Sequence, residues 1–407
     1  MSELKKKVLV LSSIYPADDL STKNTPVVHY FCRQWVTMGY SVVVVHLPYN
    51  FPFFFRVLGK LFSNAIKRHY GVATIRTSRL KESEYVLDGV IVKRFPIIKT
   101  KPHGRCNAVV INKVLKQTII YLDQIGFKPD VITGHWGNPQ LELLYKLKKH
   151  YNVPVCFVDH LGGRDVFDVY QNDSIRYLDS LDYIGFRSQS IRDKFLVHYK
   201  PQCPSFMCYS GIPEEYLSQS ITEKNFEDIS SFVFCGTLIK RKYPAEIIPA
   251  LADVFADKPF IMNYIGIGQE EVSIKNNAKK YGVEDRIVFH GYKKREQVVS
   301  ILDMCSVFIM ISRKETFGLV YLEAMGRGCI TVASRGEGFD GIIVDGYNGF
   351  LCEAGNSQEL SSIIQRIRLM PKDELNTISR NAMNTARTMT DRKVAQIYLN
   401  TIIPGMV

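Results

Sequence analysis

Residues 8–45 read VLVLSSIYPADDLSTKNTPVVHYFCRQWVTMGYSVVVV. The apolar run Val8–Leu11 predicts a buried strand that is followed by a loop. Pro26–Met38 carries apolar and aromatic residues at helical spacing, and Ser41–Val45 predicts the next strand. Strand, loop, helix and strand in this order make a βαβ unit, which predicts a parallel sheet with helices covering its faces.

The alternation of strands and helices continues in two series. Further strand candidates of the first series are Val90–Phe95, Val131–Thr133, Val155–Val158 and Tyr183–Phe186. Those of the second series are Ser231–Cys235, Phe260–Ile265, Ile287–Phe289, Val307–Met310 and Cys329–Ala333. We therefore predict an α/β fold with two Rossmann-like domains, residues 1–205 and 206–390, and a C-terminal helix, 391–407, that packs back on the first domain.

The composition is that of a globular protein with an excess of positive charge. Of the 407 residues, 46% are hydrophobic and 23% are charged, which argues against disorder on the scale of a domain. The formal net charge of +12 favours anionic partners such as phosphorylated substrates, anionic lipid or nucleic acid. The chain shows no basic helix or RNA-binding aromatic motif, so we expect no nucleic-acid partner.

The cysteines and the apolar runs indicate a cytoplasmic location. The nine cysteines form no Cys-x-x-Cys pair, which favours buried thiols in a reducing compartment over disulfides or zinc ligands. The apolar strand that follows Met1–Lys7 is too short for a signal-peptide core, and no window has the length of a membrane span.

One segment, Pro48–Tyr70, departs from the βα pattern. It interleaves Phe, Leu and Ile with Arg, Lys and His, and it contains no acidic residue. Apolar bulk beside positive charge suits contact with an anionic membrane surface, which would place the protein peripherally at the inner face of the plasma membrane. An ordinary surface insertion that packs its aromatic side chains on the domain accounts for the segment equally well.

The stretch Ser312–Gly328, SRKETFGLVYLEAMGRG, has the character of a ligand site. It follows a predicted strand, so Glu315 falls in the strand-to-helix loop and Glu323 falls on the helix. The amides of residues 317–319 then lie at the start of the helix, where free N–H groups and the helix dipole favour a phosphate. Ligands of open α/β sheets bind beyond the carboxyl ends of the strands, which is where this loop lies.

This stretch closely resembles the E-x7-E signature of retaining family 4 glycosyltransferases, with Glu315 and Glu323 at its two ends. The resemblance implies the GT-B fold, in which two Rossmann-like domains face each other across a cleft. It implies that Glu315 lies beside the donor sugar and hydrogen-bonds its hydroxyls, while Glu323 holds the ribose hydroxyls. The amides of Phe317, Gly318 and Leu319 would bind the diphosphate.

The segment Phe234–Lys242 resembles the opening of the family's donor domain, from Gly236 to Lys242. Lys242 would neutralise the diphosphate as a leaving group. Thr237 stands where the family usually has Arg, so either Lys240 or Arg241 compensates or fewer charges hold the phosphate. Further segments that resemble the donor domain are Ile265–Gly268, His290–Tyr292, Gly336–Gly338 and Asp345–Leu351, with Tyr292 in the base-binding loop.

The N-terminal half resembles the family more loosely. His160 follows a strand as the family's active-site His does, and would lie at the sugar. The loop after the first strand lacks the Gly-Gly pair that the family often carries there. His135, Trp136 and Asn138 follow another strand; they either line the acceptor cleft or form an ordinary anchor around a buried Trp.

The resemblance implies a retaining hexosyltransferase that uses a nucleotide-sugar donor, with UDP as the expected nucleotide. Glu315, His160 and Lys242 would be the catalytic residues, and neither a metal ion nor another cofactor would be needed. The acceptor would be a glycan or a lipid-linked glycan of bacterial surface polysaccharide synthesis. Two alternatives remain at this point: a GT-B nucleotide-sugar 2-epimerase, and a non-catalytic sugar- or lipid-binding partner of another transferase.

Overall fold

The computed structural model describes residues 6–20, 26–53, 79–99, 104–218, 224, 226–256 and 258–403. The chain forms two compact units. The first unit comprises Met1–Arg187, Ile191–Tyr209 and Asp391–Val407, and the second comprises Ser188–Ser190 and Ser210–Thr390. The boundary expected after residue 205 falls inside strand β10 (Ser205–Met207), which still pairs with the sheet of the first unit.

The first unit is built on an eight-stranded sheet with the order β10-β9-β8-β7-β1-β2-β5-β4. Its other strands are β1 (Lys7–Ser12), β2 (Ser41–His46), β4 (Ser83–Leu87), β5 (Val90–Arg94), β7 (Val131–His135), β8 (Val155–Asp159) and β9 (Tyr183–Phe186). Every neighbouring pair is parallel except β4 with β5. Two short strands, β3 (Tyr49–Asn50) and β6 (Ile97–Ile98), form a separate parallel pair.

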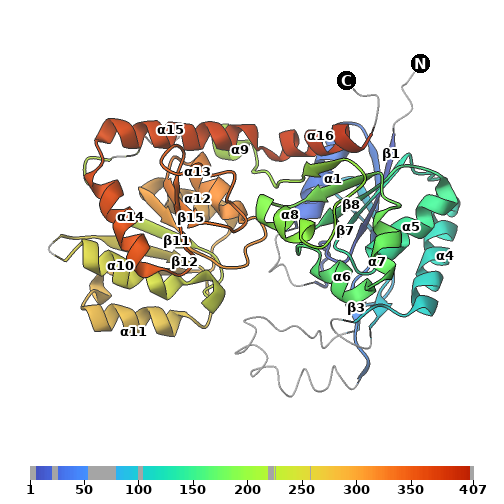
Figure 1. Cartoon of the computed structure of the whole chain (residues 1–407), viewed down its shortest axis with the longest axis horizontal. Helices are drawn as coiled ribbons and strands as arrows, with labels where there is room; N and C mark the ends of the chain where they lie inside the picture. The colour runs from blue at the N-terminus through green and yellow to red at the C-terminus, as the bar shows by residue number, and fades with distance from the viewer. Residues whose placement is uncertain are drawn as a thin grey trace. The chain divides into compact units, whose positions relative to one another are not determined.

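Seven helices accompany this sheet in the described part of the first unit (Figure 1). They are α1 (Val27–Thr37), α4 (Ala108–Gln124), α5 (Gln140–Tyr151), α6 (Arg164–Tyr170), α7 (Asp173–Leu178), α8 (Gln189–Leu196) and α16 (Asp391–Ile402). The C-terminal helix α16 packs on α1, where the fully buried Trp35 donates from Nε1 to the Ala395 carbonyl at 2.9 Å. Tyr398 adds edge-on ring contacts to Phe31 and Trp35.

The second unit is built on a six-stranded sheet, entirely parallel, with the order β13-β12-β11-β14-β15-β16. The strands are β11 (Ser231–Cys235), β12 (Ile261–Ile265), β13 (Ile287–Gly291), β14 (Val307–Ile309), β15 (Ile330–Ser334) and β16 (Phe350–Cys352). The helices are α9 (Glu215–Ser218), α10 (Ile247–Val254), α11 (Glu271–Tyr281), α12 (Arg295–Met304), α13 (Leu319–Gly326), α14 (Ser357–Leu369) and α15 (Lys372–Thr388). Three short 3-10 turns lie at Lys240–Lys242, Pro244–Glu246 and Glu284–Arg286.

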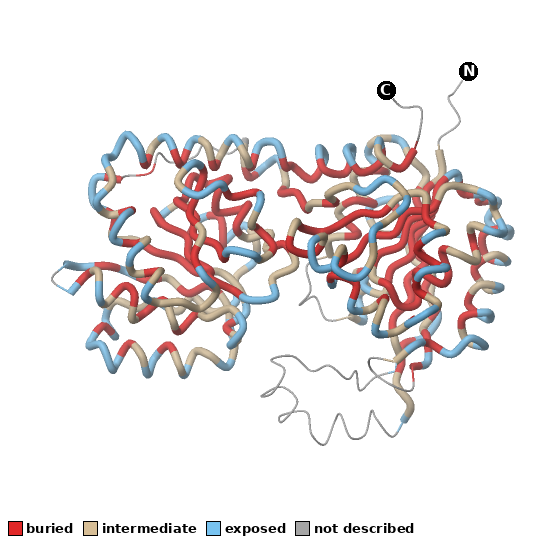
Figure 2. Tube along the Cα trace, viewed as in Figure 1, coloured by how far each residue is buried: buried red, intermediate tan, exposed pale blue. Residues whose placement is uncertain are grey.

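The central strands of both sheets are buried over most of their length, as expected of parallel strands covered on both faces (Figure 2). One buried charge braces the second unit. The Lys224 ammonium donates to the carbonyls of Leu302, Asp303 and Cys305 at 2.5, 2.9 and 2.8 Å, at the end of α12. Carbonyls at the last turn of a helix lack intrahelical partners, so this lysine acts as a C-terminal cap.

The βα alternation predicted from the sequence is confirmed, with strand ends that differ by a residue or two. Strand β5 was predicted, but its antiparallel partner β4 and the short strands β3, β6, β10 and β16 were not. Of the Phe-rich segment Pro48–Tyr70, only residues 48–53 lie within the described part, and Phe53 is exposed there.

Across the described ranges, no helix combines the length and the apolar character needed to cross a bilayer. All nine cysteines are described, and none forms a disulfide.

Candidate functional site

The loop between β14 and α13 has a conformation that its sequence dictates. Gly318 precedes α13 with φ +86°, in the left-handed region, and a Cβ at this position would lie 2.4 Å from the ring of Tyr321. Only glycine meets both conditions. The Tyr321 hydroxyl donates to the Met310 carbonyl at 2.6 Å, which ties the first turn of the helix to the end of the strand.

A cluster of charges gathers on this loop. Glu315 Oε2 lies 3.5 Å from Lys242 Nζ and 3.4 Å from Arg241 Nη1. The side chains of Glu315 and Lys242 are each 13% exposed, whereas Arg241 is 43% exposed. The Arg313 amide donates to the Arg241 carbonyl at 2.7 Å, so the 3-10 turn and the β14–α13 loop are joined through their backbones as well. One carboxylate therefore shares two cations at the carboxyl edge of the sheet.

Two further residues predicted to bind the donor are exposed to solvent. Thr237 and Lys240 are exposed, and within the described residues Lys240 forms no ion pair. Arg241, not Lys240, is thus the cation that shares Glu315 with Lys242.

Glycines bring the loops after β11 and β12 together. A Cβ at Gly266 would lie 1.9 Å from the Gly236 carbonyl oxygen, and a Cβ at Gly268 would lie 2.1 Å from that of Leu238. A Cβ at Gly236 would in turn lie 3.0 Å from Lys242 Nζ. The Ile265–Gly268 turn therefore supports the backbone that carries Lys242.

Glu323 projects from α13 and forms an ion pair that the sequence did not reveal. Its Oε1 lies 2.8 Å from Arg295 Nε and 2.7 Å from Arg295 Nη2, and the Glu323 side chain is 10% exposed. Burial, and after it the Glu323 carboxylate, raise the pKa of the neighbouring Cys235 thiol to about 12. No motif marks Arg295, which begins α12 after the β13 loop; only the fold brings it to Glu323.

The remaining donor-side predictions occupy varied surroundings. The Phe317 ring is buried and packs edge-on against Phe339, so only the backbone of this residue can face a ligand. Leu319 is half-buried as the first residue of α13. Tyr292 is 72% exposed on the loop after β13, which leaves its ring accessible.

In the first unit, the predicted histidines form a buried pair. His135 ends β7 and His160 follows β8, and their Nδ1 and Nε2 atoms lie 3.1 Å apart. The Trp136 ring stacks on His160 with a centroid distance of 4.2 Å. Burial, and then the charge of Arg187, lower the pKa of His135 to about 3, and the same causes lower the pKa of His160. Both rings are therefore neutral at physiological pH.

The predicted acceptor residues differ in what they can reach. His135 is fully buried, so its effect on a ligand would pass through His160. Asn138 is buried, and its amide donates to the Gly104 carbonyl at 3.0 Å, which is a structural use of that side chain. Trp136, with φ +66°, is half-buried beside His160. The described residues contain no group of three or more His, Cys, Asp or Glu side chains that could hold a metal ion.

These two parallel-sheet units define the class of the protein: it has the GT-B fold, as its solved structural neighbours do. Residues 219–385 match the family model described as "Glycosyl transferases group 1". The second unit is therefore a glycosyltransferase group 1 domain, and it contains the whole charge cluster around Glu315.

Individual proteins resemble the chain over larger parts. The N-acetyl-alpha-D-glucosaminyl L-malate synthase of Bacillus anthracis is 27% identical over 257 residues, which cover 60% of this chain and 66% of that protein. An uncharacterised glycosyltransferase of Methanocaldococcus jannaschii is 27% identical over 300 residues, 72% of this chain and 78% of that protein. The structure of Anabaena HepE in complex with UDP matches with a TM-score of 0.67 at 16% identity, over 97% of this chain and 99% of that one.

Proposed function

We propose that this chain is a retaining glycosyltransferase that moves a sugar from a nucleotide-diphosphate donor, a UDP-sugar, to a hydroxyl acceptor. The observation that carries the proposal is the cluster at the start of α13, where Glu315 lies between Lys242 and Arg241. The group 1 match over residues 219–385 and the likeness to relatives named glycosyltransferases support it.

The cluster suits a diphosphate beside a sugar. Lys242 and Arg241 supply two positive charges that match the negative charges of a diphosphate. The amides of residues 317–319 add donors at the amino end of α13. Glu315, once the phosphate has taken up the cations, would accept hydrogen bonds from the sugar hydroxyls, and Glu323 would accept those of the ribose.

The reaction would proceed on one face of the sugar. The bond from the anomeric carbon to the diphosphate oxygen breaks, and the acceptor hydroxyl oxygen forms a bond to the same carbon. The hydroxyl proton passes to the departing diphosphate oxygen, whose negative charge Lys242 and Arg241 stabilise. His160 would contact the outer hydroxyls of the sugar. No step requires a metal ion or a side-chain nucleophile.

The experiment measures donor hydrolysis and transfer with purified protein and a panel of UDP-, GDP- and ADP-sugars. Glu315→Gln and Lys242→Ala should each lower kcat by about 100-fold or more, since each removes a preorganised charge from a site largely shielded from water. Lys275→Ala is the matched control, because Lys275 forms an exposed ion pair with Glu271 in the same unit, at 2.7 Å. Full activity in Glu315→Gln would remove the proposal, and an epimer formed from donor alone would favour a 2-epimerase.

We extend the proposal to the acceptor: a glycan or lipid-linked glycan of bacterial surface polysaccharide synthesis, reached from the cytoplasm. The support is the net charge of +12, which favours a peripheral position at an anionic membrane surface. Sedimentation with anionic vesicles tests the membrane part, and a protein that stays in the supernatant would refute it.

A further inference from the structure

A second carboxylate, Glu337, lies behind Glu315. It belongs to the loop that follows β15, and its Oε2 accepts a hydrogen bond from the Glu315 amide at 3.0 Å. A backbone N–H here donates to a charged acceptor, and such a bond is stronger than one between two neutral groups. It fixes the residue whose side chain holds Lys242 and Arg241.

The backbones of the two loops lie in direct contact at this point. A Cβ at Gly338 would lie 2.6 Å from the Phe317 nitrogen and 2.7 Å from the Glu315 carbonyl oxygen. Only a residue without a side chain permits this approach. Residues 336–338 thus pack directly against the backbone of residues 315–317. Glu337 is the side chain that links the two loops.

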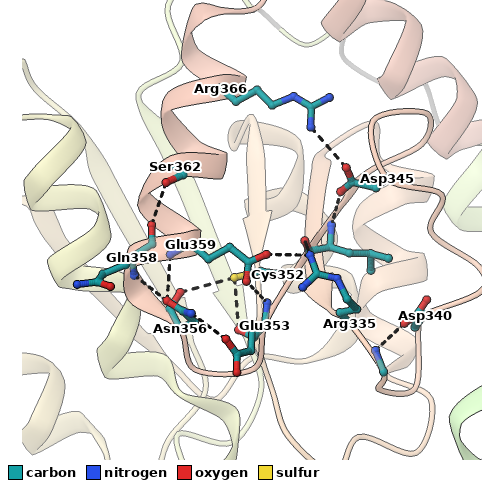
Figure 3. Close-up of polar contacts among 12 residues, drawn as sticks. Arg335, Asp340, Asp345, Cys352, Glu353, Asn356, Gln358, Glu359, Ser362 and Arg366 are labelled. Carbon is teal, nitrogen blue, oxygen red and sulfur yellow. Dashed lines mark hydrogen bonds and ion pairs between the residues drawn. The ribbon is translucent and has the colours of Figure 1, made fainter.

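Further contacts hold the loop of residues 336–338 (Figure 3). Asp340 accepts a hydrogen bond from the Gly336 amide at 2.5 Å, which closes the loop on itself. Arg335, just before the loop, forms an ion pair with Glu359 at 2.8 Å. Asp345, seven residues after the loop, lies 3.4 Å from Arg366. The chain on either side of the loop is therefore tied to α14. These contacts link the loop that carries Glu337 to α14.

We infer that Glu337 is a positioning residue for donor binding and sugar transfer, which acts by holding the Glu315 amide. The inference rests on the proposed function. Glu337 touches the backbone of Glu315, so its contribution passes through the placement of that carboxylate. Loss of the bond lets residues 315–317 move, and small displacements of a sugar-binding group lower the rate far more than they lower stability.

The test compares two substitutions of the same residue. Glu337→Gln keeps an oxygen that accepts the Glu315 N–H, whereas Glu337→Ala removes it. With a donor that the wild-type protein turns over, Glu337→Ala should lower kcat by about tenfold or more, with a smaller effect on KM. Glu337→Gln should restore most of the loss. Lys275→Ala is the control, because it breaks an exposed ion pair with Glu271 on α11 and leaves the loop that carries Glu337 untouched.

Amide hydrogen exchange gives a readout that needs no turnover. Exchange of a peptide that spans residues 312–318 should be faster in Glu337→Ala than in Glu337→Gln or the wild type, while peptides from α10 and α11 stay unchanged. Equal kcat values for wild type and Glu337→Ala, or a Gln variant as impaired as the Ala variant, would overturn the inference. A wild-type protein that turns over no donor would refute the proposed function instead, and the exchange result would still decide whether Glu337 holds the loop.

Discussion

We expect the ion pair between Arg295 and Glu323 to contribute to the free energy of unfolding, because the Glu323 side chain is largely buried. In Arg295→Met the hydrocarbon part of the side chain stays, but the Glu323 carboxylate, 10% exposed, loses its cation. Removing one partner of a fully buried pair costs about 3–5 kcal/mol. Because water can still reach part of Glu323, we expect a loss of about 2 kcal/mol, which corresponds to a fall in Tm of about 4–8 °C for a unit of this size.

Thermal unfolding followed by circular dichroism measures the effect, in a double-mutant cycle with Glu323→Gln. The double variant should recover more than half of the loss, because it leaves no unpaired charge behind. Lys275→Ala, which breaks the exposed pair with Glu271, should change Tm by less than about 1 °C. Additive losses in the double variant, or no loss in Arg295→Met, would refute the reasoning.

Three further outcomes follow from burial and contact. His135 has a pKa lowered to about 3 by burial and then by Arg187, whereas the unfolded imidazole titrates near 6.5, so stability present above pH 6.5 is lost as pH falls towards 3. His135→Phe should flatten the fall of Tm between pH 7 and pH 4, and an unchanged slope would contradict this. Lys224→Met should lower the unfolding free energy by roughly 2–3 kcal/mol, since three carbonyls at the end of α12 lose their donor; equilibrium urea unfolding measures it, and a loss below about 0.5 kcal/mol would show that water replaces the lysine. Gly268→Ala should yield little folded protein, because its Cβ would lie 2.1 Å from the Leu238 oxygen, while Gly282→Ala, with no atom within 4 Å of a Cβ, should fold; equal yields of soluble protein would count against the close contact.

The strands and helices could be predicted because their signals are local. Val8–Leu11 and Ser41–Val45 are continuous apolar runs, and both became fully or almost fully buried strands beside each other. Strand β16 was missed because Phe350–Cys352 is only three residues long and reads as part of a loop. Strand β4, the hairpin partner of the predicted β5, was missed for a different reason: Ser83–Leu87 is an edge strand with no buried residue, so it lacks the apolar alternation that marks a strand.

The residues of the candidate site likewise fall into those that sequence motifs mark and those that only the fold brings together. Glu315, Lys242 and Glu323 were found because sequence motifs surround them. Arg295 was not found, because no motif marks it. Glu337 lies in the segment Gly336–Gly338, which was noted, but its own role was not predicted, because its contact with the Glu315 amide joins segments far apart in the chain. The roles of Glu315, Lys242 and Glu323 in donor binding, and that of Glu337 in positioning Glu315, are predictions that the kinetic measurements test.

The path of the chain has a consequence for synthesis. The first unit takes its last helix, α16, from beyond the second unit, and Trp35 and Phe31 on α1 pack against that helix. On the ribosome, residues 210–390 can therefore fold while Trp35 and Phe31 still lack their contacts with α16. The first unit is completed only when α16 has been synthesised. Until then, the aromatic side chains on α1 offer an apolar surface that a chaperone can bind.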